Sequence, residues 1–291
     1  MENRESAERP VTLVNDKNLI EVSTRPSLPE YIRQLWQRRH FIFAEVHSKA
    51  FSTSQDLFLG RLWLVLDPII QAGFYALVFG IILQVNRGID NFIGYLIIGL
   101  AFFQIITSGL SGGSRLIRNN RSLISSFRFP RASLAISNNL KDVAENSVSL
   151  IVAIAIALLF QLDKPISWTI VLVVPLYLLA HLFSLGIMFF SSRAVALVPD
   201  LNSLVSLINR GLFFVSGVFF TIERFNFNPT LQSIMVANPI YQFLQAARSV
   251  IMLGTVPPFS VWLYLLGWTV ITLVLGFIYF WSAESKYDHV K

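Results

Sequence analysis

Six apolar stretches separated by polar gaps constrain this chain more than any other feature of its sequence. Each is close to the roughly 20 residues that a helix, rising about 1.5 Å per residue, needs to cross the hydrocarbon core of a bilayer. The 291 residues are 54% hydrophobic and only 14% charged, with a mean hydropathy of +0.59, which soluble domains rarely reach. We therefore expect an all-α membrane protein with six transmembrane helices. The expected spans are residues 62–85, 92–110, 147–162, 166–190, 201–222 and 259–281.

The basic residues indicate how these spans are oriented. Most Lys and Arg residues lie before the first span, between the second and third spans, or in the C-terminal tail. Positive charge marks the cytoplasmic side, so we expect both termini in the cytoplasm, and we interpret the net charge of +6 as topology and not as a sign of nucleic-acid binding. The cations between the second and third spans can meet anionic lipid head groups or a protein partner. They are Arg115, Arg118, Arg121, Arg128, Arg131 and Lys141.

The polar gaps divide the chain into regions. Residues 1–26 form a polar cytoplasmic tail, in which two β-prone runs around residues 15–18 predict either a hairpin or a mobile segment. Residues 27–60 hold an amphipathic interface helix and a linker, residues 61–281 the transmembrane domain, and residues 282–291 a cytoplasmic tail.

The interface helix is predicted by a long apolar stripe. Ser27 and Glu30 have the spacing of a capping box at its start. Apolar residues including Trp36 and Phe43 then recur every three or four positions, with basic residues such as Arg38 largely off the stripe. A helix of this kind leading into a span is expected to lie in the membrane interface, although an ordinary surface helix packed on the bundle is the alternative.

Two further segments are too long to be simple turns. The cytoplasmic connection 111–146 is expected to hold one or two short helices, broken at Pro130. The outer segment 223–258 contains apolar runs that are too short to span, divided at Asn238-Pro239. It predicts a pair of short re-entrant helices with the turn against the bundle, or alternatively a surface cap.

Charges inside the spans favour a polar path. Arg210 is the tenth residue of the fifth span, roughly 14 Å into the helix. Placing an unpaired Arg at that depth in a membrane costs about 2.5–3.5 kcal/mol, so Arg210 is expected to face a cavity or a partner. Either Asp67 is that partner, or Asp67 lies at the lipid head groups and Arg210 faces water. Most of the 25 Phe residues are packing residues, but a few can stack on sugar rings. The candidate path residues are Asp67, Phe102, Phe103, Arg210 and Phe214.

Motifs for catalysis do not accompany these features. The chain has no phosphate loop of the form G-x-x-x-x-G-K-[ST] and no Gly-Lys pair, and residues 110–114 (LSGGS) are best interpreted as small residues at a helix end. Its histidines never fall four residues apart, and it has no cysteine. We therefore expect no catalytic residue and no metal. A membrane transferase would need an acid pair or a His-Asp set, and a secondary transporter would need interrupted helices in both halves.

A series of segments resembles the permeases of polysaccharide ABC exporters. The resemblance runs from about residue 28 to residue 281 and depends on the order and spacing of weak motifs. In two places the chain departs from the family pattern: Gly217 replaces a usual Pro, and Arg193 is not followed by Asp. The matching segments are 59–68 (LGRLWLVLDP) with 75–79 (YALVF), 99–103 (GLAFF), 123–131 (LISSFRFPR), Asp200, and Asn238-Pro239 with Arg248.

The resemblance implies a transport function and a set of functional residues. It implies a homodimeric permease that binds two copies of a separate ATPase, with ATP and Mg held by that partner, in the bacterial cytoplasmic membrane. The cargo would be a polyprenyl pyrophosphate-linked polysaccharide such as O-antigen, galactan or teichoic acid; the alternative is a permease for a drug or small lipid. The implied residues are Arg118, Arg121, Phe127, Phe129, Pro130 and Arg131 for ATPase coupling, Trp36, Arg38, Arg39 and Phe43 for the cytoplasmic gate, and Asn238, Pro239 and Arg248 for the outer gate.

Overall fold

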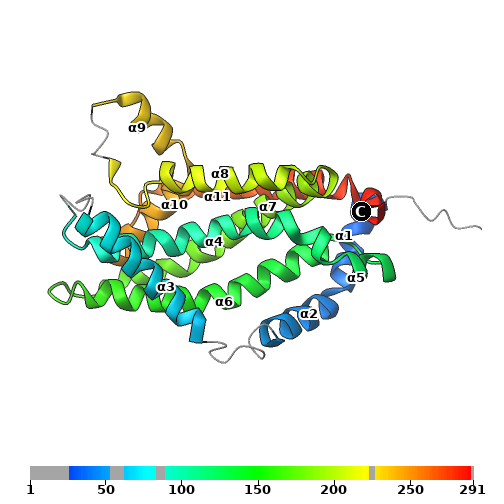
Figure 1. The fold of residues 1–291 in the computed structure, drawn as a ribbon, viewed down its shortest axis with the longest axis horizontal. Helices are drawn as coiled ribbons and strands as arrows, with labels where there is room; N and C mark the ends of the chain where they lie inside the picture. Colours follow the sequence, from blue (N-terminus) through cyan, green and yellow to red (C-terminus); the bar gives the residue numbers. More distant parts are fainter. Residues whose placement is uncertain (1–25, 53–61, 83–88, 223–226, 290–291) are drawn as a thin grey trace, which may run out of the picture.

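The computed structural model describes residues 26–52, 62–82, 89–222 and 227–289, and the regular structure within those ranges is entirely helical (Figure 1). The long helices run along the long axis of the molecule, and the all-α prediction is confirmed. The α-helices are α1 (Leu28–Gln37), α2 (Arg39–Ser52), α3 (Trp63–Tyr75), α4 (Phe92–Asn119), α5 (Arg121–Ser126), α6 (Ala132–Leu159), α7 (Val173–Leu197), α8 (Leu201–Val215), α9 (Pro229–Val236), α10 (Pro239–Arg248) and α11 (Phe259–Trp281).

Within the described ranges, five helical stretches are long and apolar enough to cross a membrane. The expected fifth span is the exception, because α8 has only 15 residues, about 22 Å of helix against a hydrocarbon core of about 30 Å. A π-helical turn, Ala76–Ile82, extends α3, and a 3-10 turn, Trp168–Leu172, precedes α7. The five candidate spans are Val65–Ile82, Phe92–Asn119, Ala132–Leu159, Trp168–Leu197 and Phe259–Trp281.

The expected connection 111–146 is mostly helix. Helix α4 continues to Asn119 and α6 begins at Ala132, so that only the short α5 and a few flanking residues separate the two. The helical hydrogen bonding continues because no proline interrupts either segment, and the extended chain before α6 falls at Phe127–Arg131, around Pro130 as predicted.

Helix α4 forms the centre of the bundle. Most of its apolar window is buried, chiefly against α7, and α7 in turn packs on α11. Small residues permit the close approach: a Cβ on Gly109 would overlap the carbonyl oxygen of Ser184, and one on Gly186 would lie 2.6 Å from the backbone of Thr272. Van der Waals packing through such residues is the usual basis of helix association in membranes, where there is little hydrophobic drive between helices.

The chain leaves the helical path at Gly217, where the sequence predicted a continuous span to residue 222. Helix α8 ends at Val215, and Gly217 has a left-handed φ of +65°. Glycine adopts this conformation without a steric penalty. The following residues, Val218 and Phe219, are fully buried although they are not helical. Their carbonyl groups therefore need donors from other parts of the protein.

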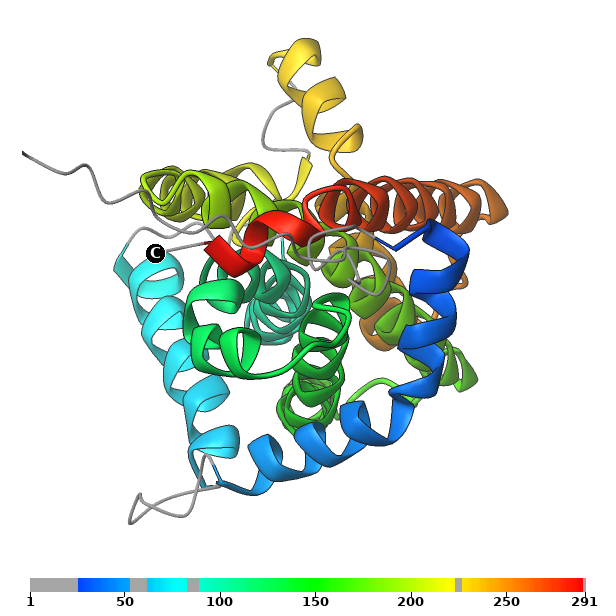
Figure 2. The same ribbon diagram turned by 90° about the vertical axis from the view of Figure 1, so that its right-hand side faces the viewer.

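The segments α1 and α5 and the C-terminus gather at one end of the bundle, which we call the junction end (Figure 1). Seen from that end, α1 and α2 wrap around the outside of the bundle, and α2 packs against α6 (Figure 2). At the opposite end, α9 projects away from the bundle whereas α10 packs against α4 (Figure 1). The possible hairpin in the N-terminal tail lies outside the described residues.

Candidate functional site

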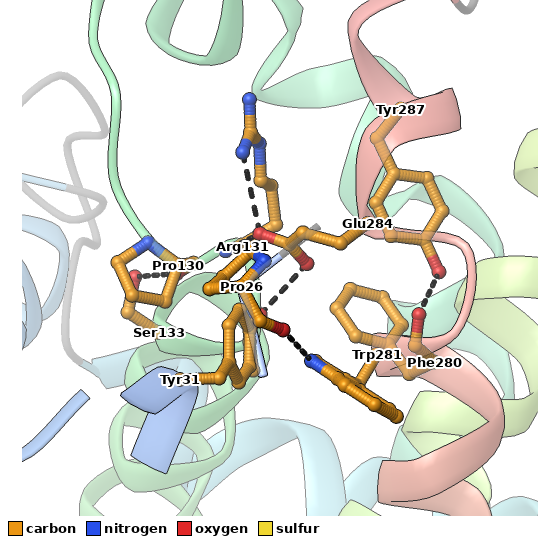
Figure 3. A network of polar contacts seen from close by, with 10 residues as sticks. Pro26, Tyr31, Pro130, Arg131, Ser133, Phe280, Trp281, Glu284 and Tyr287 are labelled. Carbon is orange, nitrogen blue, oxygen red and sulfur yellow. Dashed lines mark hydrogen bonds and ion pairs between the residues drawn. The ribbon is translucent and has the colours of Figure 1, made fainter. Parts of the chain in front are cut away.

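Three segments that are distant in the sequence meet on the carboxylate of Glu284 at the junction end (Figure 3). The Tyr31 hydroxyl donates a hydrogen bond to Glu284 Oε2 at 2.7 Å, and the backbone N–H of Arg131 donates to Oε1 at 2.8 Å. Arg131 Nη1 lies 3.3 Å from the same Oε1. The Tyr31 hydroxyl also accepts from the backbone N–H of Ala132 at 3.0 Å. This set, which we call the junction triad (Tyr31, Arg131 and Glu284), links α1, the α5–α6 connection and the C-terminal 3-10 helix Glu284–His289.

The junction triad is shielded from solvent. Glu284 is 3% exposed and Tyr31 is fully buried. Burial raises the pKa of Glu284, while the hydrogen bonds from Arg131 and Tyr31 and the charge of Arg131 act in the opposite direction. Burial and the neighbouring charge of Glu284 raise the pKa of Tyr31 well above its ordinary value, so its hydroxyl remains a donor. Removal of any one partner would leave the others buried without compensation.

An apolar cluster surrounds the triad. The indole Nε1 of Trp281 donates to the carbonyl of Pro26 at 3.2 Å, and the Tyr287 hydroxyl donates to the carbonyl of Phe280 at 2.9 Å (Figure 3). The chain ends are therefore held to α11 by hydrogen bonds as well as by packing. The buried members of the cluster include Leu35, Leu116, Ile117, Ile124, Phe129, Phe189, Phe280 and Tyr287.

The predicted coupling residues fall into two groups. Phe129, Pro130 and Arg131 belong to the junction, and the ring of Phe129 lies 5.6 Å from that of Phe41. Arg118, Arg121 and Phe127 instead have exposed side chains, 63% exposed in the case of Phe127. Of the two groups, only the exposed one is accessible to a partner protein. The buried group instead joins the α5–α6 connection to α1. The coupling role of both groups stays a prediction.

The expected interface helix is two helices, because the stripe breaks at Arg38 between α1 and α2. Tyr31, Leu35 and Ile42 are buried against the bundle. Trp36 and Phe43 point outward, with 72% and 64% of their surface exposed. The segment thus has two apolar faces, and the outward one suits a membrane surface.

Polar contacts at this helix differ in part from the expectation. Ser27 is the N-cap of α1, but its side chain forms no capping bond, so the predicted capping box is wrong. Glu30 instead accepts from Gln34 at 3.3 Å. The side chain of Arg39 donates to the carbonyl of Trp36 at 3.3 Å and lies 5.8 Å from its ring, and Arg38 is exposed.

The candidate path residues do not converge within one copy of the chain. Phe102 and Phe103 are buried in the core on α4. Asp67 on α3 is exposed and accepts from Gln71 at 2.9 Å, while Arg210 and Phe214 are exposed on α8. Among the described residues, no ion pair joins Asp67 to Arg210. A path that includes these residues would have to be completed by another surface.

The outer residues are joined by an arginine that binds backbone carbonyls. Arg248 is 2% exposed and donates to the carbonyl groups of Tyr95 (3.1 Å), Gly217 (3.0 Å) and Val218 (3.0 Å). Its guanidinium carbon also lies 3.4 Å from the centre of the Tyr95 ring. A Cβ on Gly99 would overlap the guanidinium, so the glycine provides its space. Arg248 therefore satisfies the unwound backbone after α8.

The turn before α10 is built as the Asn-Pro pair suggests. The side chain of Asn238 accepts from the backbone N–H of Ile240 at 3.0 Å and donates to Ser216 Oγ at 3.0 Å, and Pro239 is the first residue of α10. These contacts place the turn against the end of α8, as predicted. Helix α10 is buried, whereas Leu231, Ile234 and Val236 of α9 are exposed, so only the second helix of the expected pair packs into the bundle.

One motif resembles a hydrolase but lacks its geometry. Residues 109–113 have the form G-x-S-x-G, but Ser111 lies inside α4 and donates its hydroxyl hydrogen bond to the carbonyl of Thr107 at 3.1 Å. A nucleophile elbow requires a strand-to-helix turn, which this helical serine does not provide. Within the described ranges, no group of three His, Asp or Glu side chains could hold a metal ion.

The most important residues missed at the sequence level are Glu284, Tyr31, Tyr95 and Gly99. No local pattern marks Glu284, which belongs to a short polar tail. Tyr31 lies off the expected apolar stripe, so the stripe does not predict its burial. Gly99 belongs to the motif 99–103, which by itself does not predict a contact with Arg248. The contacts that give these residues their importance span up to 253 positions in the sequence.

The fold and these two sites define a polytopic helical membrane protein whose N-terminal helix, long connection and C-terminal end are fastened together. Residues 45–252 match the family described as ABC-2 type transporter, and the chain belongs to that family. Permease subunits of this family transport, lack the ATPase domain and pair with ATPase subunits.

Two relatives with described functions match over most of this chain. The O-antigen export system permease protein RfbA of Myxococcus xanthus is 23% identical over 258 residues, covering 88% of this chain and 95% of the relative. The O-antigen export system permease protein RfbA of Klebsiella pneumoniae is 25% identical over 202 residues, covering 68% of this chain and 74% of that relative.

Proposed function

We propose that this chain is the transmembrane subunit of an ATP-driven exporter of a lipid-linked cell-surface polysaccharide. The observation that carries the proposal is the similarity to two O-antigen export permeases, over 88% of this chain for one and 68% for the other. The cargo is a long glycan on a polyprenyl pyrophosphate, such as O-antigen, galactan or teichoic acid. Two copies of the chain form the transport unit in the bacterial cytoplasmic membrane, with both termini in the cytoplasm.

The ATPase binds at the junction end. Arg118, Arg121 and Phe127 are exposed beside the junction and offer cations and an aromatic ring to a separately encoded subunit, which holds ATP and Mg. In this proposal the chain itself neither binds nor hydrolyses ATP. A displacement of the α5–α6 connection by the ATPase passes to α1 through Arg131, Glu284 and Tyr31, because these residues are directly hydrogen-bonded.

The outer exit lies at the opposite end, where α10 returns into the bundle. Arg248 holds this helix to α4 and to the end of α8. The outward-facing Trp36 and Phe43 keep α1 and α2 in the interface, where a lipid-linked substrate arrives.

The test is reconstitution with a separately encoded partner ATPase. Proteoliposomes containing both proteins should move a polyprenyl pyrophosphate-linked glycan in an ATP-dependent manner, and the chain alone should hydrolyse no ATP. Transport of a fluorescent drug or a short-chain lipid without transport of the glycan would instead support the alternative, a permease for small amphiphiles. Robust ATP hydrolysis by the chain alone would contradict the proposal.

A further inference from the structure

A polar cavity of about 490 Å³ lies between the C-terminal half of α4 and the N-terminal half of α6, apart from the sites described above. Its size falls within the range of small-molecule sites, about 300–1,000 Å³. All lining residues except Gly112 and Leu116 have polar side chains. The lining residues are Ser108, Ser111, Gly112, Arg115, Leu116, Asn119, Asn120, Asn138, Lys141 and Asp142.

The cavity is unusual for a pair of membrane helices. Ser108 is roughly 24 Å along α4 from Phe92, and Lys141 is roughly 14 Å along α6 from Ala132, so the cavity extends from the junction end toward the inner part of the bundle. All lining residues except Ser108 belong to the segment 111–146, which the sequence assigns to the cytoplasmic side, so their donors and acceptors are available to water or a polar ligand.

The charges in the cavity nearly cancel. Lys141 donates to Glu145 at 3.0 Å, which pairs its charge. Asp142 accepts from Asn138 at 3.4 Å. The remaining cation, Arg115, has an exposed side chain and is opposed by the carboxylate of Asp142. A phosphate would meet this carboxylate, and only by breaking the Lys141 ion pair would it gain a second cation.

A neutral polyol fits the lining better than an anion or an apolar ligand. Amide groups offer both a donor and an acceptor, hydroxyl groups do the same, and a carboxylate accepts from hydroxyls. Sugar hydroxyls need donors and acceptors together, and the alternation of Asn119, Asn138 and Asp142 with Arg115 provides them. The polar lining gives an apolar ligand little to bind.

We propose that the cavity between α4 and α6 binds a sugar unit of the glycan before it enters the translocation path. This inference rests on the proposed export function, and it adds a recognition site for carbohydrate at the junction end. The site lies on the face of the bundle from which the proposed substrate arrives, and it makes the permease itself, rather than the ATPase alone, selective for the glycan.

Gly112 offers a direct way to fill the cavity. A Cβ at this position would lie 3.3 Å from Asn138 Nδ2, which would have to shift by a few tenths of an ångström, and 3.7 Å from the Met188 methyl group, so a leucine would occupy space beside the lining residue Asn138. Gly267 on α11 is a matched control, because no atom lies within 4 Å of its Cβ position and its neighbours Leu266 and Trp268 are exposed.

The first experiment measures ligand protection of a single cysteine. The chain contains no cysteine, so Ser111→Cys creates a unique target in the complete permease–ATPase complex. Soluble oligosaccharides released from the cell surface should slow its labelling by a maleimide, whereas inorganic pyrophosphate should not. Lys164→Cys, in the exposed connection between α6 and α7, should label at the same rate with or without either compound.

The second experiment tests the lining. Asn138→Ala should weaken protection by sugar about tenfold, as expected for one lost hydrogen bond. Asp142→Asn should weaken it as well and allow pyrophosphate to compete. Gly112→Leu should abolish both protection and glycan export, while Gly267→Leu should leave both unchanged.

The outcomes separate this inference from the proposed function. Export at the normal rate by a folded Gly112→Leu variant would overturn the sugar site and leave the export function intact. Protection of Ser111→Cys by pyrophosphate alone, or by neither compound, would also overturn it. Failure of the unmodified complex to export any glycan would overturn the proposed function itself.

Discussion

At the scale of single residues, Arg248 shows how this protein resolves a break in a membrane helix. Unwinding after Val215 frees carbonyl groups, and in a bilayer these cannot be left to water. One guanidinium, with five N–H donors in a planar fork, satisfies two of them, those of Gly217 and Val218, and also donates to the carbonyl of Tyr95 on α4. The Tyr95 hydroxyl donates to a fourth carbonyl, that of Phe220, at 2.9 Å. The arginine thus substitutes for the missing turns of α8.

Replacement of Arg248 should destabilise the outer half of the bundle. Arg248→Met removes one donor from each of three buried carbonyls, of which that of Gly217 keeps the Tyr95 hydroxyl at 3.3 Å; each carbonyl left without a donor costs about 1–3 kcal/mol. Arg248→Lys should cost less, because an ammonium can still reach some of them but lacks the planar fork. Thermal unfolding of the purified protein in detergent measures both, with Arg33→Met as a control. Arg33 forms an exposed ion pair with Glu30, so its replacement should change the free energy of unfolding by less than about 1 kcal/mol. An unchanged Tm for Arg248→Met would contradict this account.

At the scale of elements, the junction joins three segments that otherwise have little reason to move together. Helix α1 lies outside the bundle, the α5–α6 connection is short and extended, and the C-terminal 3-10 helix follows the last span (Figures 1 and 2). The buried carboxylate of Glu284 binds donors from the first two. A buried charge with specific partners fixes the relative positions of the segments that it joins more than it stabilises the fold, because the cost of desolvation offsets most of the attraction.

Two substitutions at Glu284 should differ strongly. Glu284→Ala leaves Arg131 and Tyr31 buried without their acceptor and should lower the free energy of unfolding by about 3–5 kcal/mol. Glu284→Gln keeps the shape and can still accept from Arg131, so it should cost much less while weakening the link to the connection. In the complex with the ATPase, we expect the Gln variant to hydrolyse ATP with reduced export. Equal stability of the Ala variant and the unmodified protein would contradict the role of the junction.

The pH dependence of stability provides an independent check. Burial raises the pKa of Glu284 in the folded protein above its ordinary value of 4.5. The folded state therefore holds this proton more tightly than the unfolded state does, and the stability contributed by Glu284 falls as pH rises from 4.5 through the raised pKa. The Gln variant should lack this slope, so its stability relative to the unmodified protein should increase over the same interval. Parallel pH profiles would show that Glu284 does not titrate in this way.

At the scale of the whole molecule, a single copy presents polar groups on surfaces that face outward. Arg210 lies on α8 roughly 14 Å from its start, exposed beside Leu207 and Phe214. Asp67 is exposed on α3. These positions agree with a path enclosed between two copies of the chain, in the proposed homodimer, more readily than with a path inside one.

The charge of Arg210 should matter for transport more than for assembly. If it lines a hydrated path, Arg210→Leu should reduce glycan export by about tenfold or more, because a cation at membrane depth is retained at a cost of about 2.5–3.5 kcal/mol only where it interacts with water or substrate. Arg210→Lys keeps the charge and should retain most activity. Export from proteoliposomes and the size of the complex in detergent measure the two effects. Normal export by the Leu variant would indicate that Arg210 has only a structural role.

Several features follow from local sequence alone. The length and apolarity of the spans require helices, because a helix satisfies its backbone hydrogen bonds within one segment. The connection around Pro130, the turn at Asn238-Pro239 and the outward face of Trp36 and Phe43 follow from local chemistry in the same way. The sequence does not show where α4 ends or where α6 begins, since both helices extend beyond the apolar stretch into polar residues that pack only in the folded bundle.

Only the tertiary structure decided which distant residues supply hydrogen-bond donors and acceptors to one another. The chain can stay unwound at Gly217, just after α8, because Arg248, 31 positions later, supplies donors for the freed backbone carbonyls. Glu284 becomes a junction residue because Tyr31, 253 positions earlier, lies against it, and no periodicity connects the two. The hydrophobic pattern of a membrane chain determines its helices one at a time, whereas the buried polar contacts between them depend on packing that no single segment contains.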